Sequence, residues 1–301
     1  MEVARQQDSE SAGRVLRGGP TALEAVEPPD AVLYAVLDDI RNTLGVAWLD
    51  PIFRTIASDS LFVIAAWAAT RPNITKSFSE SAGRLRKAAL DHVQSTLEPP
   101  DHLPLVHQLL RPEDADRLIR TVRALHQGLP KVYLVVQAWA RLARRQRIPG
   151  TGREEVPARR GIPSWQEGVL VPGSAAAETR ELLEETASRL DVSVVPSSLF
   201  ALAPAPAYLA EACDDIVDRA ATPAWSSGVV ALRKSVTTGI ESFPHPMELQ
   251  WDALAARGLT EERREVLCQE LRDAAAVMPV AVLSASFLCA ALGGPESTTD
   301  F

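Results

Sequence analysis

Apolar residues recur at helical spacing along most of the chain after residue 30. Val32, Val36, Ile40 and Leu44 repeat every four residues, which places them on one face of a helix. Gly45 follows them, and glycine is common just after the last residue of a helix. No run alternates apolar and polar residues for long enough to form a convincing strand. The pattern therefore predicts an all-α fold.

Further helices are expected over about 50–71, 78–97, 105–110, 112–127 and 131–145, and in the second part of the chain over about 178–194, 197–219, 225 onward, 247 onward, 261–276 and 280–292. Asp50-Pro51 marks one start, because aspartate is a favoured N-cap and proline fits the first helical position. Gly128-Leu129-Pro130 is expected to break a helix, because proline has no backbone N–H to donate.

The pattern of the first half occurs a second time. A shift of 146 positions aligns the segment from Val36 with the one from Leu182, and Ile56 with Leu202, while Pro130 falls against Pro279. Self-similarity over half the chain predicts two fused helical repeats, related by a pseudo-two-fold axis, with one pocket between them. The alternative is a chance alignment of two unrelated amphipathic patterns.

The predicted organisation has five parts. They are a mobile N-terminal tail (1–28), a first helical repeat (29–145), a linker rich in Pro, Gly and Arg (146–174), a second repeat (175–292) and a C-terminal tail (293–301).

Composition narrows the partners and the compartment. The net charge of −8 over 301 residues argues against nucleic acid and anionic membranes. The apolar run over 61–69 is too short to span a bilayer. Cys213, Cys268 and Cys289 lack metal-binding spacing and lie in apolar helical patterns, which indicates a reducing compartment. We therefore expect a cytoplasmic protein without metal, cofactor, nucleic-acid or membrane partners.

The order of several short motifs resembles a known family. GVAWLDPIFRTIA, AAWAATRP, GLPKVYLVV, a Pro/Gly-rich linker and VPSSLFALAPAPAYL follow one another as in the group I 2-haloacid dehalogenases, over about residues 30–292. The resemblance implies an all-helical enzyme of two fused repeats around one site, which hydrolyses both enantiomers of 2-haloalkanoic acids by direct attack of water. In that family an aspartate and an asparagine activate the water.

This chain departs from the family at those two positions. The asparagine position falls on Leu129 and the aspartate position on Ser198, and neither side chain is a general base. The family's serine before the aspartate is matched by Ser197 and its pocket tryptophan by Trp48, whereas Pro51 replaces an aromatic pocket residue. These five residues are the expected substrate-binding set, and hydrolysis by the family mechanism is not expected.

Two other residues are candidates for acid–base chemistry. Asp50 lies two residues from Trp48, although an N-cap role explains it equally well. His126 precedes Leu129 by three residues, hence shares a helix face with it, although a structural histidine is the alternative. Ser197 and Ser198 are expected to open a helix, either as N-caps or as a seat for a carboxylate or departing anion.

These residues predict a divergent dehalogenase-like enzyme. The expected reaction is an intramolecular displacement at a saturated carbon, which closes a ring and expels an anion in a biosynthetic pathway. Asp50 or His126 would keep the nucleophilic amine unprotonated. Two alternatives stay open: a hydrolytic dehalogenase that uses other residues, and a non-catalytic protein that binds a small acid or a partner.

The expected ligand is a small molecule with an anionic group, and a protein partner or a homo-oligomer stays possible. The enzyme hypothesis requires a pocket between Trp48, Leu129 and Ser198 with room for a small molecule.

Overall fold

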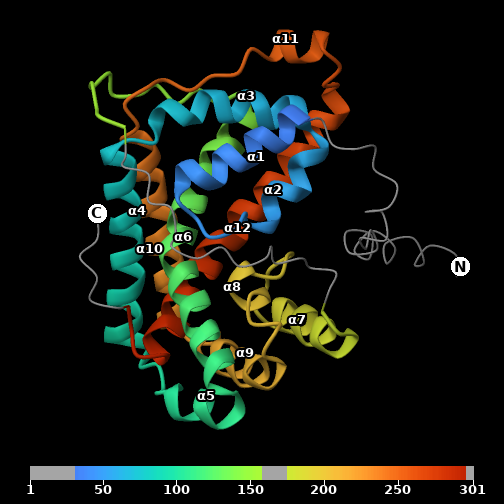
Figure 1. Cartoon of the computed structure of the whole chain (residues 1–301). Coiled ribbons are helices and arrows are strands. Elements are labelled where there is room, and N and C mark those ends of the chain that lie inside the picture. Colours follow the sequence, from blue (N-terminus) through green and yellow to red (C-terminus); the bar gives the residue numbers. More distant parts are fainter. Residues whose placement is uncertain (1–30, 158–174, 296–301) are drawn as a thin grey trace, which may run out of the picture.

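The fold is all-α, as the sequence predicts. A computed structural model describes residues 31–157 and 175–295 (Figure 1). Within these ranges two isolated β-bridges occur and no strand. The predicted mobile tail 1–28, the linker residues 158–174 and the last residues 296–301 lie outside the described residues.

Each half contributes six α-helices in the described ranges. The first half holds α1 (Ala31–Leu44), α2 (Pro51–Thr55), η2 (Ile56–Ser58), α3 (Ser60–Thr70), η3 (Arg71–Asn73), α4 (Lys76–His92), η4 (Val93–Leu97), α5 (Leu103–Leu109) and α6 (Pro112–Ala143). The second half holds α7 (Ala177–Arg189), α8 (Ser197–Phe200), α9 (Pro206–Ala220), α10 (Pro223–Glu241), α11 (Trp251–Ala256) and α12 (Glu261–Ala291).

The helices of the two halves begin at matching positions. The starts of α1 and α7 are 146 residues apart, as are those of α2 and α8 and of α3 and α9. The separation is 147 residues for α4 and α10, 148 for α5 and α11, and 149 for α6 and α12. Gly45 after α1 and Asp191 after α7 both adopt left-handed conformations, with φ of 61° and 54°. These matches support the proposed repeat, which superposition of the two halves would test.

The long helices α6 and α12 form the centre of the molecule. They pack against each other more extensively than any other pair, and α4 and α10 lie beside them (Figure 1). Helices α1, α2 and α3 gather near one end of this central pair, and α7, α8 and α9 near the other (Figure 1). Tyr133 and Trp139 of α6 and Phe287 of α12 are among the largest fully buried side chains.

Both central helices continue through a proline, so the predicted breaks are wrong. Helix α6 contains Pro130 and α12 contains Pro279, and both prolines are buried. A proline inside a helix costs about 3 kcal/mol or more. Burying one large apolar side chain contributes about 1.5–3 kcal/mol, and each of these helices buries many, so packing outweighs the lost hydrogen bond.

Two predicted long helices are interrupted instead. The helix expected over 50–71 divides into α2, η2 and α3 at Asp59, whose buried carboxylate binds Arg263 of α12 through two hydrogen bonds of 2.7 and 2.8 Å. The helix expected over 197–219 divides into α8 and α9, because Pro204 and Pro206 lack the N–H that a continuous helix needs.

Helix α12 is long and apolar enough to cross a membrane by length and composition alone. Its most apolar window has a mean hydropathy of 2.0, and 83% of that window is buried inside the protein. Such burial is typical of a core helix. Two separate helices were expected here, over 261–276 and 280–292, and neither alone has this apolar length.

Candidate functional site

Asp50 lies in the loop between α1 and α2 and caps α2. Its Oδ1 accepts a hydrogen bond from the backbone N–H of Ile52 at 3.1 Å, which confirms the predicted N-cap. The side chain is buried, with the residue only 6% exposed. In the part of the chain that the structure describes, its second oxygen, Oδ2, has no hydrogen-bond partner.

The surroundings of Asp50 strengthen it as a base. Burial raises the pKa of its carboxyl group, because a charged group loses its hydration inside the protein. The Ser197 hydroxyl and the Ile52 N–H act in the opposite direction but do not cancel this rise. Ser197 belongs to α8, so a residue of the second half lies near Asp50. The side chains of Ser197 and Asp50 form no well-aligned hydrogen bond. A carboxylate with a raised pKa accepts a proton more readily than an ordinary aspartate.

A small cavity adjoins this carboxyl group, between the α1–α2 loop and α6. Its volume is about 10 Å³, and it is lined by Val46, Ala47, Trp48, Asp50, Ala124, Leu125, Gly128, Leu129 and Val132. This is about the space that one water molecule needs. Trp48 and Leu129 line this cavity but Ser198 does not, so among the described residues it does not provide the expected room for a small molecule between the three.

Tight packing of the loop on α6 explains the small volume. A Cβ atom added at Gly128 would lie 3.2 Å from Cγ1 of Val46, so the loop rests almost directly on the helix backbone. Leu129 is 3% exposed and fills the space where the family resemblance places an asparagine. Lys131 lies inside α6, and its Nζ donates to the carbonyl oxygen of Leu44 at 2.9 Å, which ties the end of α1 to α6.

The structure does not bring His126 into this cavity. Its Nδ1 lies 3.1 Å from Oγ of Ser286 on α12, and both side chains are buried. Leu125 and Leu129, four residues apart, share the face of α6 that lines the cavity. His126 is one residue further along than Leu125, a rotation of about 100° around the helix, and points to α12 instead.

The two serines of α8 are not N-caps. They occupy the first two helical positions, Pro196 is the N-cap, and no side chain caps this helix. Ser198 is fully buried and its Oγ has no partner among the described residues. The start of α8 was predicted to hold an anion. Since α8 has only four residues, it is a single turn, and its dipole is weak. Pro51 begins α2 and does not line the cavity.

Sequence reasoning missed one comparable residue. Ser284 of α12 is fully buried and its hydroxyl also has no partner in the described ranges. It stands in an apolar run, which gave no signal of a polar role. The missed lining residues of α6, in contrast, follow from the helical spacing of Leu125, Leu129 and Val132.

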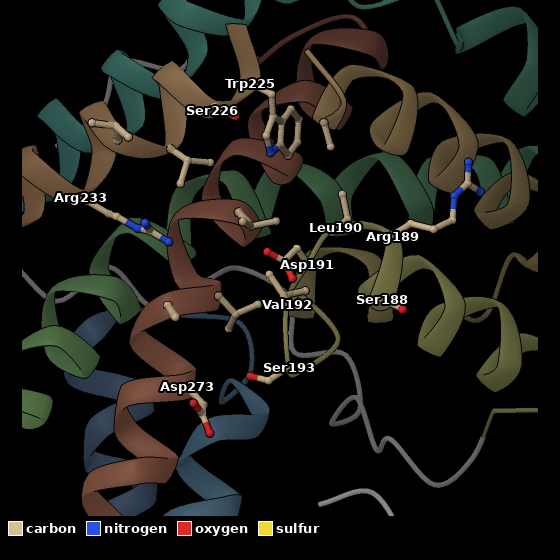
Figure 2. A pocket seen from close by; sticks show the side chains of 16 residues that line it. Ser188, Arg189, Leu190, Asp191, Val192, Ser193, Trp225, Ser226, Arg233 and Asp273 are labelled. Atoms are coloured by element: carbon tan, nitrogen blue, oxygen red, sulfur yellow. The ribbon is translucent and has the colours of Figure 1, made fainter. Parts of the chain in front are cut away.

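A larger cavity lies elsewhere, between the α7–α8 turn, α10 and α12 (Figure 2). It measures about 750 Å³, and Arg189, Asp191, Trp225, Arg233 and Asp273 are among its lining residues. None of the residues predicted from the sequence lines it. Its size suits a small ligand, but the buried carboxyl group of the candidate site is not part of it.

The chain is similar in sequence and in fold to several known proteins. No protein-family model matches the chain. The sequence is 25% identical over 237 residues to a configuration-inverting 2-haloacid dehalogenase of Pseudomonas sp. (strain 113), which covers 75% of this chain and 76% of that relative.

Solved structures show the same fold. A mutant D-2-haloacid dehalogenase in complex with D-2-CPA has a TM-score of 0.78 at 17% identity, covering 86% of this chain and 91% of that one. A complex of D-2-haloacid dehalogenase with L-LA also has a TM-score of 0.78 at 17% identity, covering 87% and 93%. The sequence similarity, the all-helical fold shared with these structures and the order of the motifs all agree with the resemblance of this chain to the all-helical 2-haloacid dehalogenases.

Proposed function

We propose that this dehalogenase-like enzyme displaces an anionic leaving group from the saturated carbon beside a carboxylate, and that Asp50 accepts the proton. One observation carries the proposal: Oδ2 of Asp50 is buried and has no hydrogen-bond partner among the described residues. An uncompensated buried carboxyl group is costly, and such a cost is typical of a group retained for function.

The base is proposed at Asp50 because the family positions offer none. Leu129 and Ser198 stand where the resemblance places an asparagine and an aspartate, and both are neutral at any working pH. Asp50 lies against the same stretch of α6, beside Leu129. In this proposal the carboxyl group of Asp50, in the first repeat, takes the role of the aspartate that the resemblance implies at the position of Ser198, in the second repeat.

The favoured reaction is the ring closure predicted from the sequence, in a biosynthetic role in the cytoplasm. An amine of the substrate attacks the carbon beside the carboxylate, and the bond to the leaving group breaks. The leaving group departs as an anion with the bonding pair, and the ammonium proton of the new ring passes to Asp50. Because both reacting atoms belong to one molecule, holding them in line saves only the rotational freedom of the bonds between them, on the order of a few kcal/mol.

Hydrolysis is a second candidate, favoured by the size of the cavity. Its volume of about 10 Å³ beside Asp50 suits one water molecule. In this version the carboxylate takes a proton from that water, whose oxygen attacks the carbon as the leaving group departs.

Either reaction needs more room than this form provides. We propose that the loop 45–49 moves away from α6 when the substrate binds. The loop is attached at its start, where Lys131 binds the carbonyl of Leu44, and Gly45 there has the left-handed φ of 61°. A hinge at this glycine would open the face of α6 that carries Leu129.

Two probes distinguish the candidates. Purified full-length protein is incubated with each enantiomer of 2-chloropropionate and with 4-amino-2-chlorobutanoate, and chloride and organic products are measured. Ring closure predicts azetidine-2-carboxylate and chloride from the amine, with little or no chloride from 2-chloropropionate. Hydrolysis predicts chloride and lactate from 2-chloropropionate.

Variants then test the base. In either case Asp50→Asn should lower the rate by about 10²–10⁴-fold, whereas Asp38→Asn, at an exposed aspartate of α1 outside the cavity, should not. His126→Gln tests the other candidate base and should have a much smaller effect than Asp50→Asn, with circular dichroism to verify folding. Unchanged turnover in Asp50→Asn would refute the role of this residue. No chloride from any probe would favour the non-catalytic alternative.

A further inference from the structure

Within the described part of the chain, a groove outside the candidate site is lined by three arginines and by no acidic residue. It lies between α6, α10 and α12, and measures about 380 Å³. Arg144 comes from the end of α6, Arg233 from α10 and Arg272 from α12. Their convergence depends on the tertiary fold, because they are far apart in the sequence.

These three guanidinium groups are not neutralised by any carboxylate among the residues that the structure describes. Arg144 donates from Nε to the carbonyl oxygen of Ala140 at 3.0 Å, and Arg272 donates from Nη1 to Oε1 of Gln269 at 2.8 Å. Arg233 makes no side-chain hydrogen bond within the described residues. None of the three forms an ion pair with a carboxylate in those ranges, so most of their donors are available.

Nearby arginines behave differently. Arg145 and Arg264 both form ion pairs with Glu261, the first at 3.0 Å. Acidic side chains are therefore present around the groove but bind other partners. In a chain of net charge −8, three unpaired arginines in one groove make a local positive potential that favours an anion.

Neutral donors complete the lining. Tyr133 and Gln137 of α6 line the same groove. Thr237 of α10 lines it too, but its hydroxyl already donates to the carbonyl oxygen of Arg233 at 3.0 Å. Burial raises the pKa of Tyr133 well above its usual range, and the smaller, opposite effect of Arg233 does not reverse this. Its phenol therefore keeps its proton and can donate a hydrogen bond to an anionic oxygen.

We propose that this groove binds the phosphate group of a small phosphorylated ligand. Guanidinium forks match the oxygens of phosphate and bind it through paired hydrogen bonds. Three positive charges suit a phosphate ester or diphosphate better than a single carboxylate. The volume lies within the range of small-molecule sites and exceeds that of free phosphate.

The groove continues beyond the three arginines. Arg233 and Ala276 also line the cavity of about 750 Å³ that contains Trp225, so the two spaces share a boundary. Figure 2 shows the side chain of Arg233 reaching from α10 toward that cavity. The organic part of the ligand is assigned to this second space. The proposal does not depend on the chemistry at Asp50.

Calorimetric titration of the full-length protein tests this site. The probes are pyrophosphate, inorganic phosphate, adenosine monophosphate and sulfate. We expect the natural protein to bind the phosphate probes. Arg144→Gln, Arg233→Gln and Arg272→Gln should each weaken this binding by about 10- to 100-fold, the usual effect of losing one charge-assisted hydrogen bond. Tighter binding of the monophosphate ester than of inorganic phosphate identifies an ester, and equal binding identifies free phosphate.

Arg120→Gln is the matched control, because Arg120 is exposed on α6 outside the groove. It should leave affinity unchanged. Circular dichroism verifies that each variant folds. Three outcomes would each overturn the proposal. The first is that Arg120→Gln weakens binding as much as the groove variants do. The others are that sulfate binds equally well and no groove variant affects it, or that no probe binds at 10 mM, on the order of the weakest specific sites.

Discussion

At the scale of single residues, two aspartates of the first half show opposite electrostatic behaviour. Burial raises the pKa of Asp50, and its hydrogen bonds do not compensate. Burial also acts to raise the pKa of Asp39, but hydrogen bonds from Arg71 and Trp67 outweigh it and lower the pKa. The first aspartate is therefore costly to ionise in the fold, whereas the second is stabilised as an anion.

This difference predicts how stability changes with pH. The ordinary pKa of Asp50 is 3.8, and in the fold it is higher. The raised pKa means that the protonated carboxyl group of Asp50 favours the folded state. This contribution to stability is complete below pH 3.8 and is lost as the pH rises through the pKa of the folded protein. Asp50→Asn cannot ionise, so the variant should gain stability relative to the natural protein as pH rises, by up to about 1.4 kcal/mol per pH unit. Urea unfolding between pH 4 and 8 measures this.

Asp39→Asn is the control for that measurement. The lowered pKa of Asp39 contributes stability above pH 3.8 that is lost as the pH falls through the folded pKa. The variant should therefore lose stability relative to the natural protein as pH rises. Parallel pH profiles for the two variants would contradict the assigned electrostatics of both aspartates.

At the scale of elements, α10 approaches its neighbours at two glycines. A Cβ atom at Gly228 would lie 2.7 Å from the ring of His92 on α4, and one at Gly239 would lie 2.8 Å from Leu134 on α6. Nε2 of His92 lies 2.8 Å from the carbonyl oxygen of Ala224, so its ring is held in place. Close helix packing here requires residues without a side chain.

Gly228→Ala should destabilise the protein although alanine favours helices. The added methyl group would displace His92 from its contact with Ala224 and press on Leu283. Overpacking costs about 1–3 kcal/mol and the gain in helix propensity is about 1 kcal/mol, so the net loss of stability is up to about 2 kcal/mol. Chemical denaturation measures the change.

Gly83→Ala in α4 provides the matched comparison, because nothing lies within 4 Å of a Cβ atom at Gly83. It should stabilise the protein by about 0.5–1 kcal/mol. A destabilising effect of Gly83→Ala equal to that of Gly228→Ala would show that the close contact is not the cause.

At the scale of the whole molecule, the two halves depend on each other. Helices α6 and α12 pack along each other in the centre and bury most of their apolar side chains. Asp59 of the first half binds Arg263 of the second, and Ser197 of the second half lies near Asp50 of the first. The proposed repeats are therefore halves of one core.

Separated halves should not fold independently. Fragments 1–157 and 158–301 would each expose a long apolar face that the other covers. We expect neither alone to show a cooperative thermal transition, and both together to co-purify and regain helical content by circular dichroism. A cooperative transition in a monomeric single fragment would contradict this.

The sequence by itself determined the features that depend on near neighbours. The all-α class follows from the spacing of residues such as Val36 and Ile40, and the start of α2 from the capping of Ile52 by Asp50. The order of motifs also indicated the resemblance to the 2-haloacid dehalogenases. A helix start and an apolar face need only residues within one or two turns, so a linear pattern contains the information.

Only the tertiary structure decided the rest, because it depends on contacts between residues distant in the chain. Burial against the partner helix keeps α6 continuous through Pro130, and the packing of α12 places Ser286 beside His126. The α1–α2 loop closes on Gly128 and leaves space for one water beside Asp50. The three arginines of the groove, too, meet only when α6, α10 and α12 are packed together.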